Sequence, residues 1–250
     1  MPAVLGCDPG DWEDRVRSDP PVVSLVGGGG KTTCVLTLSN ECLRAGIGAV
    51  VATTTHMQMP FDRYLLQSED MDALHGLMRR EGQVWLGRRL GKTEATVRHK
   101  SETLSLSFIS RVCRENSAPV LIEADGARCL PCKAPGEEEP VLVPETTHLV
   151  SVYGLDALGE RIRDCCFRPE LVSAVTGKGE QERIEEEDLV RLALSKQGGR
   201  KGLTEDMHHV VVLNKADESA REEQARRIAA QLTDGGAERV LITGGLHREL

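Results

Sequence analysis

The chain has 250 residues, 40% of them hydrophobic, which is enough to bury a sizeable core in one domain. Its formal net charge of −8 argues against a nucleic-acid partner, whose phosphates require a basic surface. No apolar run approaches the ~18 residues of a membrane span, and residues 1–20 lack the apolar core of a signal peptide. Eight cysteines at uneven spacing without a secretory signal are typical of reduced thiols. We therefore expect a cytoplasmic protein with neither a membrane nor a nucleic acid as partner.

Apolar strand segments alternate with helical segments along the chain, the pattern of an open, mainly parallel sheet covered on both faces. The expected strands are 22–26, 49–53, 120–122, 149–153, 210–213 and 239–242. The expected helices are 31–45, 101–115, 169–175, 185–194 and 218–232. Residues 1–20 are expected to form a loosely ordered leader anchored by Trp12, and 21–250 a single domain. Irregular insertions are expected near 57–100, with a short hairpin around 84–86, and near 126–147.

The first expected strand leads into a glycine turn and then a helix. This run consists of Gly27, Gly28, Gly29, Gly30, Lys31, Thr32 and Thr33. Successive glycines let backbone N–H groups converge on an anion, and the helix N-terminus adds its positive dipole end. In such a phosphate-binding loop Lys31 would reach the β- and γ-phosphates, and the Thr32 hydroxyl would ligate Mg²⁺. A glycine turn without a ligand is the alternative.

The spacing of this run is shorter than the common GxxxxGK[ST], because Leu25 stands where the first glycine would be. The shorter GxxGKTT is similar to the loops of Mur ligases and of metal-insertion GTPases. Taken with the order of the elements, it predicts an α/β protein with a three-layer P-loop NTPase-type fold and a mostly parallel sheet.

An acidic pair, Glu123 and Asp125, follows the apolar strand 120–122, and Gly126 comes next. Ligands of open α/β sheets sit at the carboxyl ends of the strands, where a carboxylate can hold Mg²⁺ or position water. The pair is therefore predicted to be catalytic together with Lys31, and to bind Mg²⁺ together with Thr32. Two solvated loop acids are the alternative.

The strand 210–213 ends in Asn214, Lys215, Ala216 and Asp217, the N-K-x-D pattern with which GTPases read guanine. An aspartate carboxylate accepts hydrogen bonds from guanine N1–H and N2–H₂, which adenine cannot offer. The lysine stem would lie along the base, and the asparagine would brace the neighbouring loop. Alternatively, Asp217 caps the helix that follows. The loop 243–245 is only weakly similar to the second base-contacting loop of GTPases.

Two further motifs are less specific. The threonines of 53–55 end the second strand and could complete a Mg²⁺ shell or simply end a β-branched strand. Cys129 and Cys132 form a lone C-x-x-C, which supplies two ligands where zinc needs three or four. A soft-metal or redox role is one interpretation of these thiols, and incidental small apolar residues are the other.

The segments 26–33, 53–57, 123–135, 139–140 and 152–158 together resemble the YqeC family, regarded as accessory proteins of selenium-dependent hydroxylases. The most specific part is Glu-Ala-Asp-Gly-Ala-Arg at 123–128, followed by Pro131, 133–135 and 139–140. Residues 168–170 fit a further block. The chain departs from the family pattern in its thiols at 129 and 132, and in Phe167, where a histidine is expected.

This resemblance implies a role in the maturation of selenium-dependent molybdenum hydroxylases, with such an enzyme or its cofactor-maturation proteins as partners. Together with the motifs it predicts a nucleotide-binding accessory protein that uses Mg²⁺ and GTP or ATP, favours GTP, and hydrolyses it slowly. Two alternatives remain open. One is an ATP-dependent kinase or ligase that acts on a cofactor precursor, and the other is a nucleotide-binding protein without hydrolysis.

Overall fold

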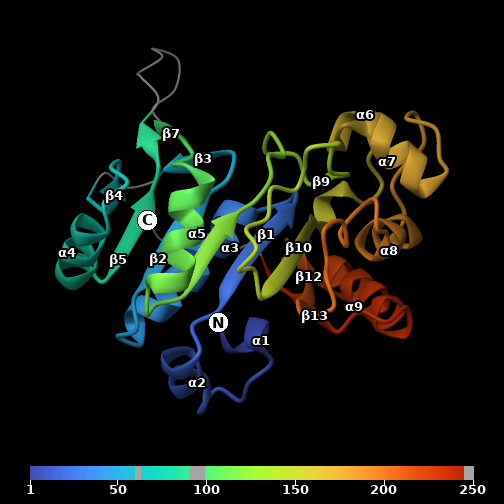
Figure 1. Cartoon of the computed structure of the whole chain (residues 1–250). Helices are drawn as coiled ribbons and strands as arrows, with labels where there is room; N and C mark the ends of the chain where they lie inside the picture. Colours follow the sequence, from blue (N-terminus) through green and yellow to red (C-terminus); the bar gives the residue numbers. More distant parts are fainter. Residues whose placement is uncertain (60–62, 90–98, 245–250) are drawn as a thin grey trace.

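The computed structural model describes residues 1–59, 63–89 and 99–244 and is built around an eight-stranded sheet (Figure 1). In spatial order its strands are β13 (Arg239–Ile242), β12 (His208–Asn214), β10 (His148–Gly154), β1 (Val22–Gly27), β8 (Val120–Glu123), β2 (Ala49–Thr53), β5 (Gln83–Leu86) and β4 (Leu65–Leu66). Every ladder between these neighbours is parallel. The predicted α/β class with a mostly parallel sheet is therefore confirmed.

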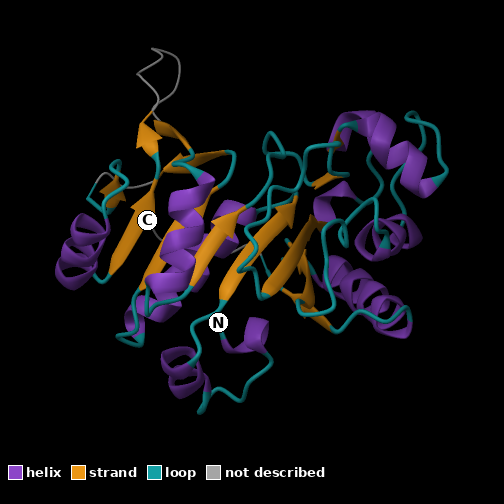
Figure 2. Cartoon of the chain, in the orientation of Figure 1, coloured by secondary structure: helices purple, strands orange, loops and turns teal. Residues whose placement is uncertain are grey.

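Helices cover both faces of this sheet and give three layers (Figure 2). Successive side chains of a strand point to opposite faces, so β1 contributes Val23 and Leu25 to the core beneath one layer and Val22 and Val26 to the other. A strand buried on both sides is rich in apolar residues, and β1 is apolar apart from Ser24, whose buried hydroxyl is hydrogen-bonded to that of Thr146. The helices are α1 (Pro2–Leu5), α2 (Trp12–Ser18), α3 (Lys31–Arg44), α4 (Met71–Glu81), α5 (Leu106–Glu115), α6 (Ile162–Cys165), α7 (Pro169–Thr176), α8 (Glu186–Leu194) and α9 (Ser219–Asp234).

The order of the strands reverses at β1. From β1 the chain passes through α3 to β2, which lies two places away with β8 between them. After β8 the chain crosses to β10, on the other side of β1, and continues outward to β12 and β13, so the two halves of the sheet are built in opposite directions from β1. Such a reversal is where open α/β sheets bind their ligands. The glycine run follows β1 and therefore lies at this point.

The prediction that residues 57–100 are irregular is partly wrong, because part of this region forms regular secondary structure. It contains α4, which Asp70 caps by accepting hydrogen bonds from the N–H groups of Asp72 and Ala73. The expected hairpin around 84–86 is instead β5, which pairs in parallel with β2 in the main sheet. A small antiparallel sheet consists of β3 (His56–Met59), β7 (His99–Glu102) and β6 (Arg88–Arg89). The rest of that prediction concerns residues 60–62 and 90–98, which lie outside the described residues.

Three other segments differ in detail from what the sequence predicts. The helix expected from 101 begins only at Leu106, because the Ser105 hydroxyl caps it by accepting from the N–H of Phe108. Within 1–20, α1 and α2 form, and Trp12 and Val16 are buried in the core. In the loop 126–147, β9 (Cys132–Lys133) pairs with β11 (Cys166–Phe167). Among the residues that the structure describes, none belongs to a helix long and apolar enough to cross a membrane.

Two buried histidines, His148 and His209, lie near the amino ends of β10 and β12, at the edge opposite to the glycine run. Burial lowers the pKa of each to about 4. For His148, the neighbouring His208 ring and Arg239 and Arg15 lower the pKa further, while Glu238 opposes them. For His209, Arg200 lowers the pKa and Glu238 opposes it. Both imidazoles are therefore neutral in the folded protein at neutral pH.

These histidines predict that acid destabilises the fold. Below the usual histidine pKa of about 6.5 the unfolded chain binds protons that the folded protein does not bind until about pH 4. The free energy of unfolding should thus fall as the pH is lowered from about 6.5 to 4, by about 3 kcal/mol for each histidine. Urea denaturation at pH 7 and pH 4.5 measures it. The double variant His148→Gln/His209→Gln should show a smaller change in the free energy of unfolding between the two pH values. The control variant His75→Gln, on α4, should behave as the unmodified protein. An equal change in the unmodified protein and in both variants would show that the two buried histidines are not the cause.

Candidate functional site

The glycine loop between β1 and α3 has a backbone that only glycine adopts readily. Gly27, Gly29 and Gly30 have φ values of 92°, 72° and 125°. A Cβ at Gly27 would lie 2.4 Å from the carbonyl oxygen of Val152, and one at Gly29 would lie 2.1 Å from the amide nitrogen of Gly154. The loop is therefore pressed against the end of β10, and its glycines are required by this close approach as well as by their φ angles.

Lys31 begins α3 and turns back over the loop into a buried cluster of acids. Its ammonium donates a hydrogen bond to the carbonyl oxygen of Gly27 at 2.5 Å. The same Nζ lies 3.0 Å from Asp125 Oδ1 and 3.9 Å from Glu123 Oε1. Burial disfavours the charged form of Lys31, but the ion pairs with Asp125 and Glu123 outweigh it, and the pKa of Lys31 is raised. Lys31 is therefore charged, and its ammonium is held in a fixed position beside the glycine loop.

The two predicted acids reach the loop because β8 lies directly beside β1, with Glu123 in register with Leu25. Glu123 Oε2 accepts a hydrogen bond from the Thr32 hydroxyl at 2.8 Å. Asp125 Oδ2 accepts one from the Gly27 N–H at 3.0 Å. Burial raises the pKa of Glu123, although the charge of Lys31 opposes the shift. Lys31, Thr32, Glu123 and Asp125, predicted separately, are thus brought together in one cluster.

This cluster offers oxygen ligands of the kind that Mg²⁺ prefers. The Thr32 hydroxyl is hydrogen-bonded to Glu123, and Asp125 forms an ion pair with Lys31, the residue before Thr32. Within the described part of the chain no group of three or more His, Cys, Asp or Glu side chains is arranged to hold a metal alone. Mg²⁺ in nucleotide sites keeps several waters and takes phosphate oxygens, so one or two protein ligands suffice. The residues therefore fit that ion.

The N-K-A-D segment reaches the same loop from β12, which lies beyond β10 in the sheet. The Asn214 amide donates to the carbonyl oxygen of Gly29 at 2.7 Å, and its oxygen accepts from the Thr243 hydroxyl at 2.9 Å. Lys215 has a left-handed backbone, with φ of 68°, and its ammonium lies 2.5 Å from Asp156 Oδ2. The asparagine therefore braces the glycine loop against the end of β12.

Asp217 lies in the turn between β12 and α9, beside the segment that follows β13. A Cβ placed on Gly244 would lie 3.3 Å from Asp217 Oδ1. The helix α9 begins at Ser219, and the residue at its N-cap position is Glu218. The alternative in which Asp217 is the N-cap residue is therefore wrong. Gly245, the last residue of the proposed second base loop, lies outside the described residues.

The threonines at the end of β2 serve the backbone. Thr53 Oγ1 donates to the carbonyl oxygen of Glu123 at 3.1 Å, and Thr54 Oγ1 donates to that of Val141 at 2.8 Å. The Thr55 hydroxyl is buried and has no hydrogen-bond partner among the described residues. Thr53 and Thr54 thus hold β8 and the 126–147 loop in place beside the acids.

A segment that sequence reasoning did not place at the site, 130–132, lies over the glycine loop. The Leu130 carbonyl oxygen accepts from the Gly29 N–H at 3.0 Å, and that of Pro131 accepts from the Gly154 N–H at 2.9 Å. A Cβ on Gly28 would lie 2.7 Å from the Leu130 oxygen. A side chain at Gly28 would therefore collide with the Leu130 carbonyl, so this position of the loop also requires glycine.

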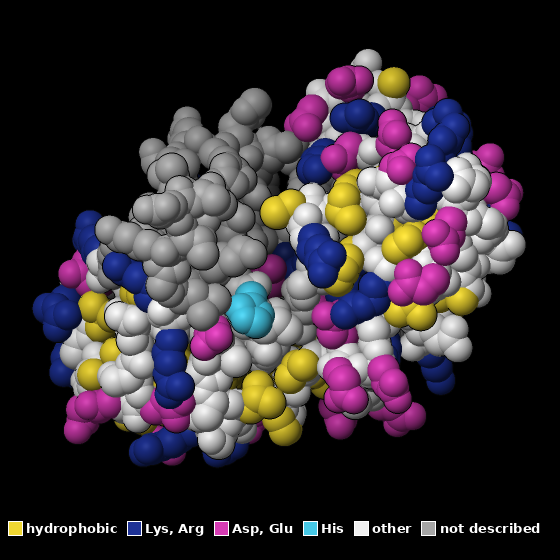
Figure 3. Space-filling view, turned by 90° about the horizontal axis from the view of Figure 1, so that it is seen from above, with side chains coloured by type: hydrophobic (Ala, Val, Ile, Leu, Met, Phe, Trp, Pro, Cys, Tyr) yellow, Lys and Arg dark blue, Asp and Glu magenta, His cyan; other side chains and the backbone are white. Residues whose placement is uncertain are grey.

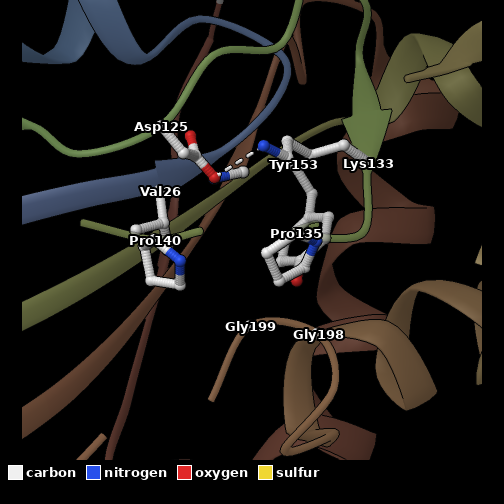
Figure 4. Close-up of a pocket in the computed structure, with 9 residues that line it drawn as sticks. Val26, Asp125, Lys133, Pro135, Pro140, Tyr153, Gly198 and Gly199 are labelled. Carbon is white, nitrogen blue, oxygen red and sulfur yellow. Dashed lines mark hydrogen bonds and ion pairs between the residues drawn. The ribbon is translucent and has the colours of Figure 1, made fainter. Parts of the chain in front are cut away.

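Lys133, in β9, was likewise not predicted as a site residue. Its side chain is fully buried and its ammonium lies 3.0 Å from Asp125 Oδ2, the oxygen opposite to the one that faces Lys31 (Figure 4). The same ammonium donates to the carbonyl oxygen of Gly126 at 2.7 Å and to Glu139 at 2.5 Å. Asp125 therefore bridges two lysines. The only sequence signal for Lys133 and Glu139 is their place in the family pattern of the 123–140 segment.

The two cysteines of the C-x-x-C lie in different surroundings. Cys129 is exposed, whereas Cys132 is buried opposite Cys166 in the β9–β11 pair. Cys165 Sγ lies 3.5 Å from Cys166 Sγ. A hydrogen bond with Cys132 raises the pKa of Cys166, and one with Cys166 raises that of Cys165, so both thiols are protonated at neutral pH. A soft-metal or redox role for Cys129 and Cys132 remains an untested prediction.

Backbone strain is concentrated around this edge of the sheet. The non-glycine residues that the structure describes with positive φ are Arg128, Cys129, Arg168 and Lys215. Arg128 and Cys129 follow β8 and Lys215 follows β12, at the carboxyl ends of these strands, and Arg168 lies between β11 and α7. Such conformations cost roughly 1 kcal/mol or more and are typical of functional sites.

Several Lys and Arg side chains lie near the middle of the face seen from above, with hydrophobic side chains beside them (Figure 3).

The fold and the site define a class: a parallel α/β protein with a glycine loop and a buried Lys–Asp–Glu cluster at the carboxyl edge of its sheet. Comparison with known proteins narrows the class further. The family model "YqeC protein" matches residues 23–170, so the chain belongs to the YqeC family. It is also similar to the "Uncharacterized protein YqeC" of Escherichia coli (strain K12), with 28% identity over 217 residues, 78% of this chain and 76% of that protein. The predicted family is therefore confirmed.

Proposed function

We propose that the chain binds a Mg²⁺–nucleoside triphosphate at the loop 27–33. The observation that carries this proposal is the convergence of Lys31, Thr32, Glu123 and Asp125 on a loop of four consecutive glycines. In this proposal the N–H groups at the start of α3 and the Lys31 ammonium hold the phosphates. Thr32 ligates Mg²⁺, which neutralises phosphate charge, and Glu123 and Asp125 position that ion or water.

The base would lie beyond β10, near Lys215 and Asp217. The bond from Asn214 to Gly29 supports this placement, because it ties the segment directly to the phosphate loop. We propose that Asp217 reads guanine and that the Lys215 stem lies along the base, with Asp156 holding its ammonium. GTP is therefore the proposed nucleotide.

The proposed biological role is nucleotide-dependent assistance in the maturation of selenium-dependent molybdenum hydroxylases. It rests on the family resemblance, while the site chemistry supports slow Mg²⁺-dependent hydrolysis that resets a partner-binding conformation. A second candidate is an ATP-dependent kinase or ligase acting on a cofactor precursor. The short G-x-x-G-K-T loop favours it, because the loops of Mur ligases are similar.

Hydrolysis tests the role of the acids. Glu123→Gln and Asp125→Asn should each reduce Mg²⁺-dependent phosphate release at least ~10-fold, because a metal-linked carboxylate acts mainly in the transition state. Nucleotide binding without Mg²⁺ should change little. Glu145→Gln, on the loop before β10, is the matched control. Phosphate release under single-turnover conditions is the measurement, and parental rates in both variants would show that the acids are structural.

A further inference from the structure

Three cations surround one aromatic ring beside the proposed nucleotide site. The guanidinium carbons of Arg128 and Arg168 lie 5.0 Å and 4.6 Å from the centroid of the Phe167 ring. The Lys133 ammonium lies 5.6 Å from the same centroid. Each contact is of cation–π type and stabilises one cation on the ring. Three cations on one ring also repel one another, so the cluster favours an added negative charge.

The carboxylate near this ring, that of Glu139, pairs with two of the three cations and leaves the third without an ion pair among the described residues. Glu139 accepts from Lys133 and from both terminal nitrogens of Arg168. Burial opposes the charge of Glu139, but Arg168 and Lys133 outweigh it and hold its pKa at about 2, so it is ionised. Arg128 is exposed and has no hydrogen bond or ion pair with any described residue. The cluster thus presents one uncompensated guanidinium next to a second whose remaining N–H donors are partly accessible.

The sequence places both arginines by an unusual backbone. Arg128 and Arg168 have φ values of 49° and 60°, although neither is glycine. Arg128 follows β8 and the acid pair, while Arg168 follows β11 and precedes Pro169, the first residue of α7. Two loops far apart in sequence therefore each adopt a strained conformation and bring a guanidinium to the same ring.

We propose that Arg128, Arg168 and Phe167 form a binding site for a small molecule that carries a carboxylate or phosphate group. The planar guanidinium fork matches either oxyanion, with two parallel N–H···O bonds. Lys133 contributes positive potential from within the fold and connects this site to Asp125 and so to Lys31. The inference deepens the proposed function by giving the class of the second ligand, which binds beside the nucleotide.

The test uses inorganic phosphate and malonate as probes, in separate isothermal titrations of the full chain. Lys31→Met removes the charge of the glycine loop, so that this loop no longer binds the probes. We expect the Lys31→Met protein still to bind at least one probe, which also distinguishes the phosphate from the carboxylate class. Adding Arg128→Gln should weaken that binding at least ~10-fold, because a charge-assisted pair is lost. Adding Arg163→Gln, an exposed arginine of α6, is the matched control.

Two results would overturn the inference: no binding of either probe by the Lys31→Met protein, or equal binding with and without Arg128→Gln. If Lys31→Met does not fold, the number of binding sites is compared between the unmodified protein and Arg128→Gln instead, and Arg128→Gln should have one site fewer for phosphate, for malonate or for both. Nucleotide binding is measured on the unmodified protein in a separate titration. The proposed function and the second site therefore fail independently.

Discussion

Lys31→Met should reduce the affinity for Mg²⁺-GTP at least ~100-fold. The ammonium of Lys31 is held at the start of α3 by Gly27, Asp125 and Glu123, where the phosphates of a bound nucleotide would replace part of those contacts. Charge-assisted contacts with phosphate are among the strongest polar interactions, and ~100-fold corresponds to about 3 kcal/mol. Methionine keeps an apolar stem of similar length, so the change removes mainly the charge.

The fold of this variant should persist, because Asp125 keeps two other partners. Its Oδ2 accepts from the Gly27 N–H and lies 3.0 Å from Lys133 Nζ. Circular dichroism and isothermal titration with Mg²⁺-GTP measure folding and affinity, and the exposed Lys196→Met is the matched control. A folded Lys31→Met protein with undiminished affinity would exclude the loop as the phosphate site.

Asp217→Asn should change which base the protein binds. A carboxylate accepts from both guanine N1–H and N2–H₂, whereas adenine offers an acceptor at N1 and nothing at C2. Binding adenine would leave Asp217 unpaired, so the unmodified protein should prefer GTP to ATP at least ~100-fold. The asparagine amide accepts at one position and donates at the other. It therefore suits xanthine, which has a carbonyl at C2.

Affinities of GTP, ATP and XTP for both proteins measure this change. The variant should lose affinity for GTP and gain affinity for XTP, while Asp206→Asn, before β12, should behave as the unmodified protein. A merely structural Asp217 predicts an unchanged order of affinities. A preference for ATP in the unmodified protein, or no gain for XTP in the variant, would favour the ATP-dependent kinase or ligase.

The central fold could be predicted from the sequence because its strands are buried on both sides. The central parts of β1, β8 and β12 are almost entirely apolar, with Ser24 as the exception in β1, and the parallel arrangement follows from the helices between them. Motifs that directly follow such strands are also easy to place, since the carboxyl ends of parallel strands share one edge. The convergence of Lys31 with Asp125 follows from this rule.

Other features depended on contacts between loops, which periodicity does not reveal. The helix α4 lies in a region whose charged residues resemble a loop, and its buried face became clear only through packing on β5. Lys133 reaches Asp125 because the 126–147 loop folds back across the glycine loop, where Leu130 accepts from Gly29. Nothing in the local pattern of Arg128 or Arg168 indicates that both lie on the Phe167 ring.

Hydrogen exchange of the unmodified protein, with and without saturating Mg²⁺-GTP, measures whether the start of α3 holds the phosphates of a bound nucleotide. The nucleotide should slow exchange of the amides from Gly30 to Thr33, because these N–H groups at the start of α3 would then bind phosphate oxygens. The amides of Gly28 and Gly29 already donate to Val152 and Leu130 and should change less. Exchange should also slow in the segment 214–217. Saturable binding that leaves the amides from Gly30 to Thr33 unprotected, or no binding of any nucleoside triphosphate, would contradict the proposed site.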